Sequence, residues 1–206
     1  MIIYLLRHAQ SYPQFDVSTE NWPLSPKGDR QAGQLVSVLE SLSIDKVYSS
    51  PYKRCLDTIK PFIDKHDIPC EIHDELRECH VTHKFMAKEE FLKVFEKSWE
   101  DFSFCLEDGE SCQEAQKRIV DFLNGLEANG NHNLLLSSHG NLIGLLLNHI
   151  DRSFGSNDAN QLMNPDIKKL KIGRHIEWDR SFDSKSILCD FYSDLDNVPV
   201  KYHHDS

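Results

Sequence analysis

The chain has 206 residues, of which 39% are hydrophobic and 27% are charged, a composition that excludes a disordered or fibrous protein. This length suits one catalytic domain over residues 1–206. The formal net charge of -10 argues against nucleic acid as a partner, because nucleic-acid binding depends on clustered lysine and arginine side chains.

The N-terminal apolar run has no basic segment before it and stops at Arg7. It therefore lacks the features of a signal peptide, and it is too short to span a bilayer. We expect a cytoplasmic protein with no membrane partner. The cysteines do not occur in C-x-x-C pairs, which predicts free thiols rather than disulfides. The cysteines are Cys55, Cys70, Cys79, Cys105, Cys112 and Cys189.

Strand and helix patterns alternate along the first three quarters of the chain. Unbroken apolar runs at 2–6 and 134–136 predict strands that are buried on both faces, and shorter strands are expected at 46–49 and 70–73. The alternation predicts an α/β fold with three layers, in which a largely parallel central sheet has helices on both faces. Ligands in such folds collect beyond the carboxyl ends of the strands.

Several helices have recognisable first turns. Ser25-Pro26 combines a capping serine with proline at the first helical position, and Ser50-Pro51 repeats this pattern, which places Arg54 in a first turn. Residues 111–114 form a capping box for an amphipathic helix that we expect to end at Asn129-Gly130.

Less regular patterns occupy the remaining chain. Aromatic residues at helical spacing over 91–102 predict a charged surface helix inserted over the sheet, so residues 79–110 form a candidate lid over the active site. After an apolar helix at 142–150, only residues 186–192 have the pattern of another strand. The basic run at 167–171 is interpreted as a solvated face.

Basic side chains occur where predicted strands end or helices begin. Arg7-His8 follows the first strand, and His139 follows the strand at 134–136. Arg54 lies at a helix start, where free N–H groups and the helix dipole favour an anion. Taken singly, the Arg-His pair could be a surface accident, Arg54 a surface side chain and His139 a hydrogen-bonded core histidine. Together they predict one phosphate pocket.

These motifs, in this order, resemble the histidine phosphatase superfamily, which includes the cofactor-dependent phosphoglycerate mutases. The resemblance covers about residues 1–150, and the order of the motifs is more specific than any one of them. The motifs are Arg7-His8, Leu24-Ser25-Pro26-Lys27-Gly28 with Gln31-Ala32, Ser50-Pro51 with Arg54, Gly109-Glu110-Ser111 and Ser138-His139-Gly140.

The resemblance implies a phosphoglycerate mutase-like fold and a reaction in which His8 takes the phosphoryl group. It implies that Arg7, Arg54 and His139 bind the phosphoryl oxygens. Gln14 stands where many members have asparagine and is assigned to the same phosphate site.

The resemblance also implies an acid after the third strand that handles protons. Glu78 fits the spacing of the family, with Glu75 and Glu71 as rivals. Two departures affect the substrate-facing loop rather than the phosphate pocket. Ala9 replaces a glycine that often follows the histidine, and residues 79–83 lack the glycines that are usual after the acid.

The chemistry of phosphoryl transfer supports this assignment independently. Charge spreads over the phosphoryl oxygens, so arginine forks can stabilise the transition state without a metal or cofactor. His8 must attack as neutral imidazole, whereas His139 is expected to be more useful when protonated. The predicted protein is a metal-independent phosphatase that acts on a small phosphorylated substrate.

Three alternatives stay open on the sequence. A phosphoglycerate mutase would need further basic groups for a substrate carboxylate, and residues 79–108 contain lysine but no arginine. A noncatalytic phospho-ligand-binding module would need neither His8 nor Glu78. A metal-binding protein is suggested by Cys79-His80-x-x-His83, but a second ligand pair at recognisable spacing is lacking.

Overall fold

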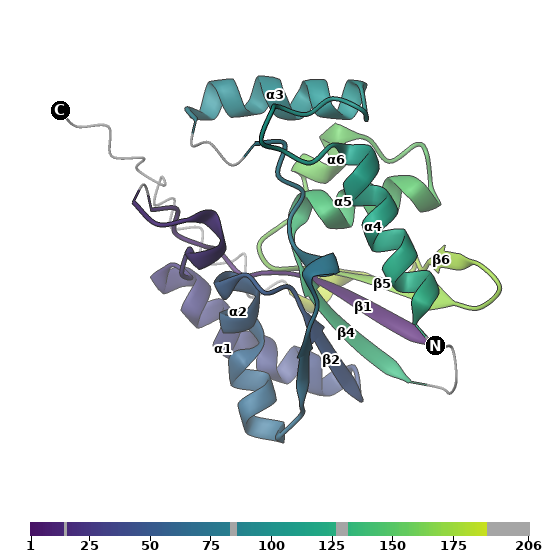
Figure 1. The fold of residues 1–206 in the computed structure, drawn as a ribbon. Helices are drawn as coiled ribbons and strands as arrows, with labels where there is room; N and C mark the ends of the chain where they lie inside the picture. Colours follow the sequence, from purple (N-terminus) through teal and green to yellow (C-terminus); the bar gives the residue numbers. More distant parts are fainter. Residues whose placement is uncertain (15, 83–85, 127–131, 189–206) are drawn as a thin grey trace.

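A computed structural model describes residues 1–14, 16–82, 86–126 and 132–188. Within these residues, the centre of the protein is a six-stranded sheet with the order β3-β2-β4-β1-β5-β6 (Figure 1). The first four strands of that order run parallel, and β5 and β6 are antiparallel to their neighbours. The strands are β1 (Ile2–Arg7), β2 (Lys46–Ser49), β3 (Cys70–Ile72), β4 (Asn133–Ser138), β5 (Asp166–Ile172) and β6 (Ile176–Trp178).

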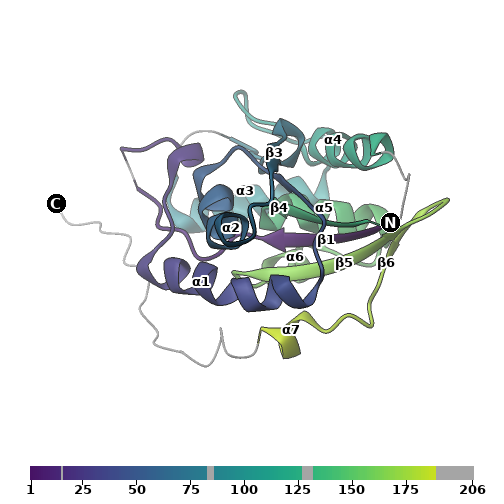
Figure 2. The ribbon, with the colours of Figure 1, turned by 90° about the horizontal axis from the view of Figure 1, so that it is seen from below.

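Helices cover both faces of the sheet, which confirms the predicted three-layer α/β architecture. Figure 2 shows α1 and α7 on one side of the strands and α4 on the other. The helices are α1 (Pro26–Ser41), α2 (Lys53–His66), α3 (Lys88–Glu100), α4 (Cys112–Gly125), α5 (Gly140–Ile150), α6 (Ser156–Asn160) and α7 (Ser184–Ile187), and the short 3-10 turns are η1 (Thr19–Asn21) and η2 (Asp74–Leu76).

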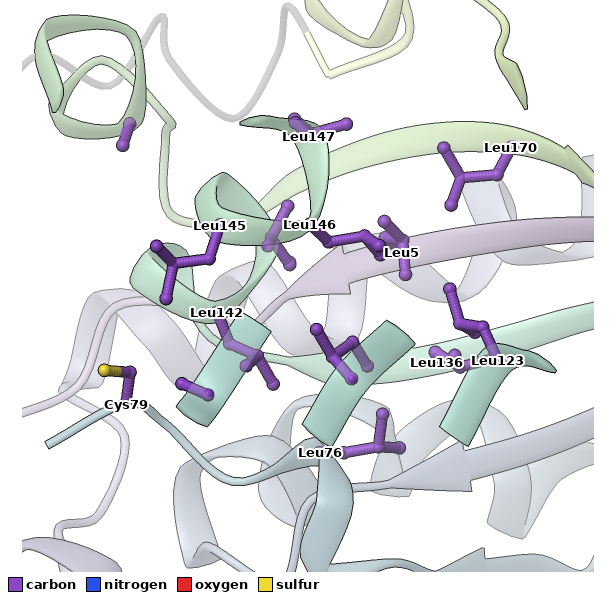
Figure 3. Packing of buried hydrophobic residues seen from close by; sticks show 14 of the residues in the cluster. Leu5, Leu76, Cys79, Leu123, Leu136, Leu142, Leu145, Leu146, Leu147 and Leu170 are labelled. Carbon is purple, nitrogen blue, oxygen red and sulfur yellow. The ribbon is translucent and has the colours of Figure 1, made fainter. Parts of the chain in front are cut away.

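The core consists of two main apolar clusters, one on each face of the sheet. Because side chains alternate along a strand, Leu5 of β1 joins the cluster under α4 and α5, while Leu6 joins the cluster under α1 and α2. Figure 3 shows part of the first cluster, where Leu146 of α5 lies near Leu5 of β1 and Leu123 of α4 lies near Leu136 of β4. Each fully buried leucine contributes about 1.5–3 kcal/mol to folding.

The capping patterns of the sequence are confirmed for two helices. The Ser25 hydroxyl accepts a hydrogen bond from the amide of Gly28 at 3.0 Å, and α1 begins with Pro26. The capping box between Ser111 and Glu114 is formed at the start of α4. However, α4 ends at Gly125, and the predicted end at 129–130 lies outside the described residues.

The second predicted cap is wrong. Helix α2 begins at Lys53, with Tyr52 at the capping position and no side-chain cap. The reason is that the Ser50 hydroxyl lies 2.8 Å from Nε2 of His139 and so is committed to another element. Arg54 still lies in the first turn of α2, as predicted.

The chain after α5 contains two strands that the sequence pattern did not indicate. The basic run at 167–171 belongs to β5, an interior strand of the sheet, and is not a solvated face. Its lysines obscured the pattern because they pair with the carboxylates of Asp166 and Asp179. The strand predicted at 186–192 is also wrong in its first residues, which end α7, and its remainder lies outside the described residues.

The candidate lid helix, α3, packs against α5 rather than directly on the sheet. Trp99 donates a hydrogen bond from Nε1 to Oδ1 of Asn141 at 2.9 Å, and its ring contacts α5 at Gly144. A lid role for residues 79–110 stays a prediction. The cysteines among the described residues are free thiols, and Cys189 lies outside them. No helix in the described ranges is long and apolar enough to cross a membrane.

Candidate active site

The carboxyl ends of β1 and β4 bring the two predicted histidines together. These strands are parallel neighbours with Arg7 opposite Ser138, so His8 and His139 follow at the same edge of the sheet. Their ring centroids are 5.3 Å apart, and both side chains are buried. The first turn of α2 adds Arg54, whose Nε donates to Nε2 of His8 at 3.1 Å. The structure therefore brings three of the predicted residues into direct contact or close proximity.

The hydrogen bonds of His8 define its protonation. The carbonyl of Ala9 can only accept, so Nδ1 of His8 donates to it at 2.7 Å. Because the guanidinium of Arg54 can only donate, Nε2 of His8 carries the lone pair. Burial, together with the positive charges of Arg54 and Arg7, holds the pKa of His8 well below its usual value. His8 is therefore neutral near pH 7, as an attacking imidazole must be.

His139 has a different set of neighbours. Its Nε2 lies 2.8 Å from the Ser50 hydroxyl and 3.4 Å from Sγ of Cys55. Burial and the charge of Arg54 also hold the pKa of His139 well below its usual value. The expectation that His139 works in protonated form is therefore not supported by its surroundings, which favour neutral imidazole.

Arg7 reaches the same edge from the last position of β1. Its Nη1 donates to the carbonyl of Leu162, and its Nε is a buried donor without a hydrogen-bond partner among the described residues. Burial lowers the pKa of Arg7, although the carboxylates of Glu78 and Asp166 oppose this shift. A Cβ at Gly140 would lie only 2.7 Å from Cζ of Arg7, which explains why the Ser-His-Gly motif needs glycine there.

Glu78 lies beside this cluster at the N-terminus of α5. Its Oε1 accepts from the amide of Leu142 at 2.9 Å, and its Oε2 accepts from the amide of Asn141 at 3.2 Å. These first-turn amides have no partner within the helix, so they hold the Glu78 carboxyl group in place. The rival acids point elsewhere, because Glu71 pairs with Lys46 and the carboxylate of Glu75 lies 3.7 Å from His73. The geometry thus favours Glu78 among the three.

Gln14 is the predicted site residue that the described contacts do not join to the cluster. Its backbone carbonyl accepts from Nε1 of Trp22 at 3.1 Å. The Trp22 ring in turn faces Arg54, with 5.9 Å between the guanidinium carbon and the ring centroid. Gln14 therefore lies near the site through this loop, and its role in phosphate binding stays a prediction.

Several polar side chains that the sequence patterns did not identify as site residues hold the backbone around His8 and Arg54. Nδ2 of Asn164 donates to the His8 carbonyl at 2.8 Å, and the Asn164 carbonyl accepts from Gln31 at 2.8 Å. The Thr58 hydroxyl accepts from the amide of Ala9 and donates to the carbonyl of Arg54. Gln31 occurs in one of the motifs given above and could have been singled out, whereas Asn164 lies outside all of them.

In the described part of the chain, no three His, Cys, Asp or Glu side chains are grouped as a metal ion would require. The described residues therefore give no support to the metal-binding alternative. His83 of the Cys-His-x-x-His pattern lies outside that part.

Comparisons with known proteins agree with the fold of this chain. One solved structure, from Entamoeba histolytica, is a mutant phosphoserine phosphatase in complex with phosphoserine, with 22% identity, a TM-score of 0.73 and coverage of 91% of this chain and 98% of that chain. A mycobacterial glucosyl-3-phosphoglycerate phosphatase with inorganic phosphate has 20% identity, a TM-score of 0.71 and coverage of 86% and 93%. YhfR of Bacillus stearothermophilus has 17% identity, a TM-score of 0.70 and coverage of 89% and 98%.

These structures share the fold. A search of curated proteins found no match. The model of the histidine phosphatase superfamily (branch 1) matches residues 3–175, which is most of the chain. The protein therefore belongs to the histidine phosphatase superfamily.

Proposed function

We propose that this protein is a metal-independent phosphoric monoester hydrolase that works through a phosphohistidine on His8. The observation that carries the proposal is the 3.1 Å hydrogen bond from Nε of Arg54 to Nε2 of His8. It places a nucleophilic lone pair beside a guanidinium that can bind a phosphoryl oxygen. Local positive charge at this buried edge outweighs the remote negative charge of the molecule.

The proposed reaction has two steps. Nε2 of His8 attacks phosphorus, the ester P–O bond breaks, and the departing alkoxide takes a proton from Glu78. Water then attacks the phosphohistidine, gives a proton to Glu78 and releases inorganic phosphate. Arg7, Arg54 and His139 stabilise the charge on the phosphoryl oxygens in both steps.

His139 can serve this purpose as a neutral donor. The Ser50 hydroxyl accepts from the amide of Tyr52 at 3.3 Å, and its own proton is best used in donation to Nε2 of His139. Nε2 of His139 then bears the lone pair, and Nδ1 carries the single N–H proton of the neutral ring, which it can donate to a phosphoryl oxygen. Binding of a phosphate dianion would also raise the pKa of His139.

Hydrolysis is favoured over the mutase reaction by two observations. The solved structures with similar folds include phosphatases, and the candidate lid over residues 79–108 contains no arginine for a substrate carboxylate. We propose a small phosphorylated substrate and a cytoplasmic location.

Trapping of the phosphoenzyme tests the proposal. A short incubation with ³²P-labelled phosphate ester, quenched with alkali, should label the wild-type chain, because a phosphohistidine is stable to alkali and labile in acid. His8→Ala should abolish the label and lower kcat by on the order of 10⁴-fold or more. Undiminished labelling of His8→Ala would refute the nucleophile. Loss of wild-type turnover of p-nitrophenyl phosphate in EDTA would refute metal independence.

A further inference from the structure

An ion-pair network contacts the chain next to the proposed acid. The carboxylate of Glu110 accepts from Nε of Arg118 at 2.9 Å and from Nη2 of Arg118 at 2.8 Å. Nη2 of Arg77 donates to the same carboxylate at 3.1 Å. The side chains of Glu110 and Arg118 are 16% and 13% exposed, so this bidentate pair is well shielded from water.

The free end of the Arg118 fork holds the backbone in front of Glu78. Nη1 of Arg118 donates to the carbonyl of Arg77 at 3.2 Å and to the carbonyl of Glu75. The intervening Leu76 is fully buried, and its carbonyl accepts from the Ser138 hydroxyl at 2.9 Å. The carbonyls of residues 75, 76 and 77 are therefore all fixed immediately before Glu78.

Glu110 also holds the backbone that follows Glu78. Its amide donates to the carbonyl of His80 at 2.7 Å. The close approach of the two segments requires Gly109, because a Cβ at that residue would lie 1.9 Å from the Val81 carbonyl oxygen. Ser111, the next residue, caps α4. The Gly-Glu-Ser motif thus contacts the chain on both sides of Glu78, at Arg77 and at His80.

We propose that Glu110 and Arg118 are positioning residues for the proton transfer by Glu78. Residue 78 must keep its carboxyl group aimed at the ester oxygen while its own backbone lies in a segment without regular secondary structure. The Glu110–Arg118 pair supplies rigidity to this segment, because the Arg118 guanidinium, oriented by the Glu110 carboxylate, fixes the peptides before Glu78 to α4, while the main-chain amide of Glu110 binds the His80 carbonyl after it. This inference rests on the proposed function, in which Glu78 is the acid.

A series of aryl phosphates separates positioning of the acid from general stability. p-Nitrophenyl, phenyl and 4-methoxyphenyl phosphate differ little in size, but their leaving groups need increasing help from a proton donor. In the wild type, log kcat/KM should depend weakly on leaving-group pKa, because Glu78 supplies the proton. Arg118→Lys should steepen this dependence, with a loss on the order of 10-fold for 4-methoxyphenyl phosphate and under about threefold for p-nitrophenyl phosphate.

Three further variants make the result interpretable. Glu78→Gln should steepen the slope at least as strongly as Arg118→Lys. Glu110→Gln should reproduce the effect of Arg118→Lys and serves as the second variant if Arg118→Lys does not fold. Lys117→Ala breaks an exposed ion pair with Asp121 on the same helix and should leave the slope unchanged. Inhibition by inorganic phosphate should stay within about threefold of wild type in Arg118→Lys and in Glu110→Gln, because the phosphate pocket of both variants is intact.

The outcomes distinguish failure of the positioning role of Glu110 and Arg118 from failure of the assignment of Glu78 as the acid. If Glu78→Gln steepens the slope but Arg118→Lys and Glu110→Gln lower all substrates equally or not at all, the positioning role is refuted and the acid stands. If Glu78→Gln does not steepen the slope, the assignment of the acid fails and the positioning role falls with it. Neither outcome affects the labelling of His8.

Discussion

The edge formed by β1 and β4 and the segment from Leu162 to Asp166 meet at the same residues but contribute different things. The edge supplies the groups proposed to react, with His8 and His139 at equivalent strand ends. The Leu162–Asp166 segment supplies only supports. Its first carbonyl accepts from the Arg7 guanidinium, and Asn164 donates to the His8 carbonyl. Asp166, opposite Arg7 in the register of β1 and β5, is a buried carboxylate that favours the charged guanidinium.

The comparison shows that placement and orientation have different structural origins in this protein. Parallel strands bring the residues that follow them to one edge of the sheet, whatever conformations their side chains adopt. The orientation of the side chains depends on segments without regular secondary structure, which hold peptide groups and guanidinium nitrogens at particular angles. A small misplacement of a catalytic group costs reaction rate. Variants of the edge should therefore cost more activity than variants of the supporting segment.

Removal of Arg54 should have the largest effect among these variants. Arg54→Ala deletes a buried guanidinium that contacts the nucleophile, and we expect a loss of about 3 kcal/mol of transition-state stabilisation, on the order of 10²-fold in kcat/KM. Steady-state kinetics with p-nitrophenyl phosphate measure this loss. Lys53→Ala, which breaks an exposed pair with Asp57 on the same helix turn, is the matched control and should be close to wild type. A loss of less than about threefold for Arg54→Ala would remove Arg54 from the pocket.

The same division explains what could be predicted from sequence. The proximity of His8, Arg54 and His139 could be predicted because buried apolar strands and helix starts are visible as patterns, and the strand topology brings these residues to one edge. The sequence left three candidates for the proposed acid, namely Glu71, Glu75 and Glu78. Only the structure, through the contact of Glu78 with the first turn of α5, gives a reason to prefer one of them.

The rest could not be predicted for physical reasons. Strand β5 was misread because its half-buried Lys168 and Lys169 pair with the carboxylates of Asp166, which begins β5, and Asp179, which follows β6, a compensation that hydropathy does not register. The cap at Ser50 was misplaced because its hydroxyl is used by a residue distant in the chain. Asn164 acts through one side-chain hydrogen bond to a backbone carbonyl, which leaves no periodic pattern.

Loss of the Asn164 side chain should have an intermediate effect. Asn164→Ala removes the hydrogen bond to the His8 carbonyl, and we expect a fall in kcat of about 10-fold because the imidazole is less well aimed. The free energy of unfolding should fall by about 1 kcal/mol. Inhibition by inorganic phosphate should change little, since no phosphate contact is assigned to Asn164. Asn160→Ala, at an exposed position that ends α6, is the control. Equal losses of kcat and phosphate affinity in Asn164→Ala would show that the segment shapes the pocket itself.

The last prediction concerns stability rather than activity, and it depends on the two histidines of the edge. Burial and the arginine charges hold the pKa values of His8 and His139 well below the usual 6.5, so both imidazoles are neutral in the folded protein near neutral pH. The unfolded chain takes up these two protons below about pH 6.5, whereas the folded protein does not. Stability is therefore full above this pH and is lost as pH falls towards the folded pKa values, by at most about 1.4 kcal/mol per pH unit for each imidazole.

Urea unfolding between pH 8 and pH 5 measures this dependence. The double variant His8→Asn with His139→Asn should have a flatter profile below pH 6.5, because it lacks both groups that resist protonation. His66→Asn removes an imidazole that pairs with Glu40 on the surface and should leave the slope due to the two buried histidines in place. Saturating inorganic phosphate should also flatten the profile, since an anion against the two rings raises their pKa values. A profile that is unchanged in the double variant would mean that the buried histidines are not the groups that couple folding to pH.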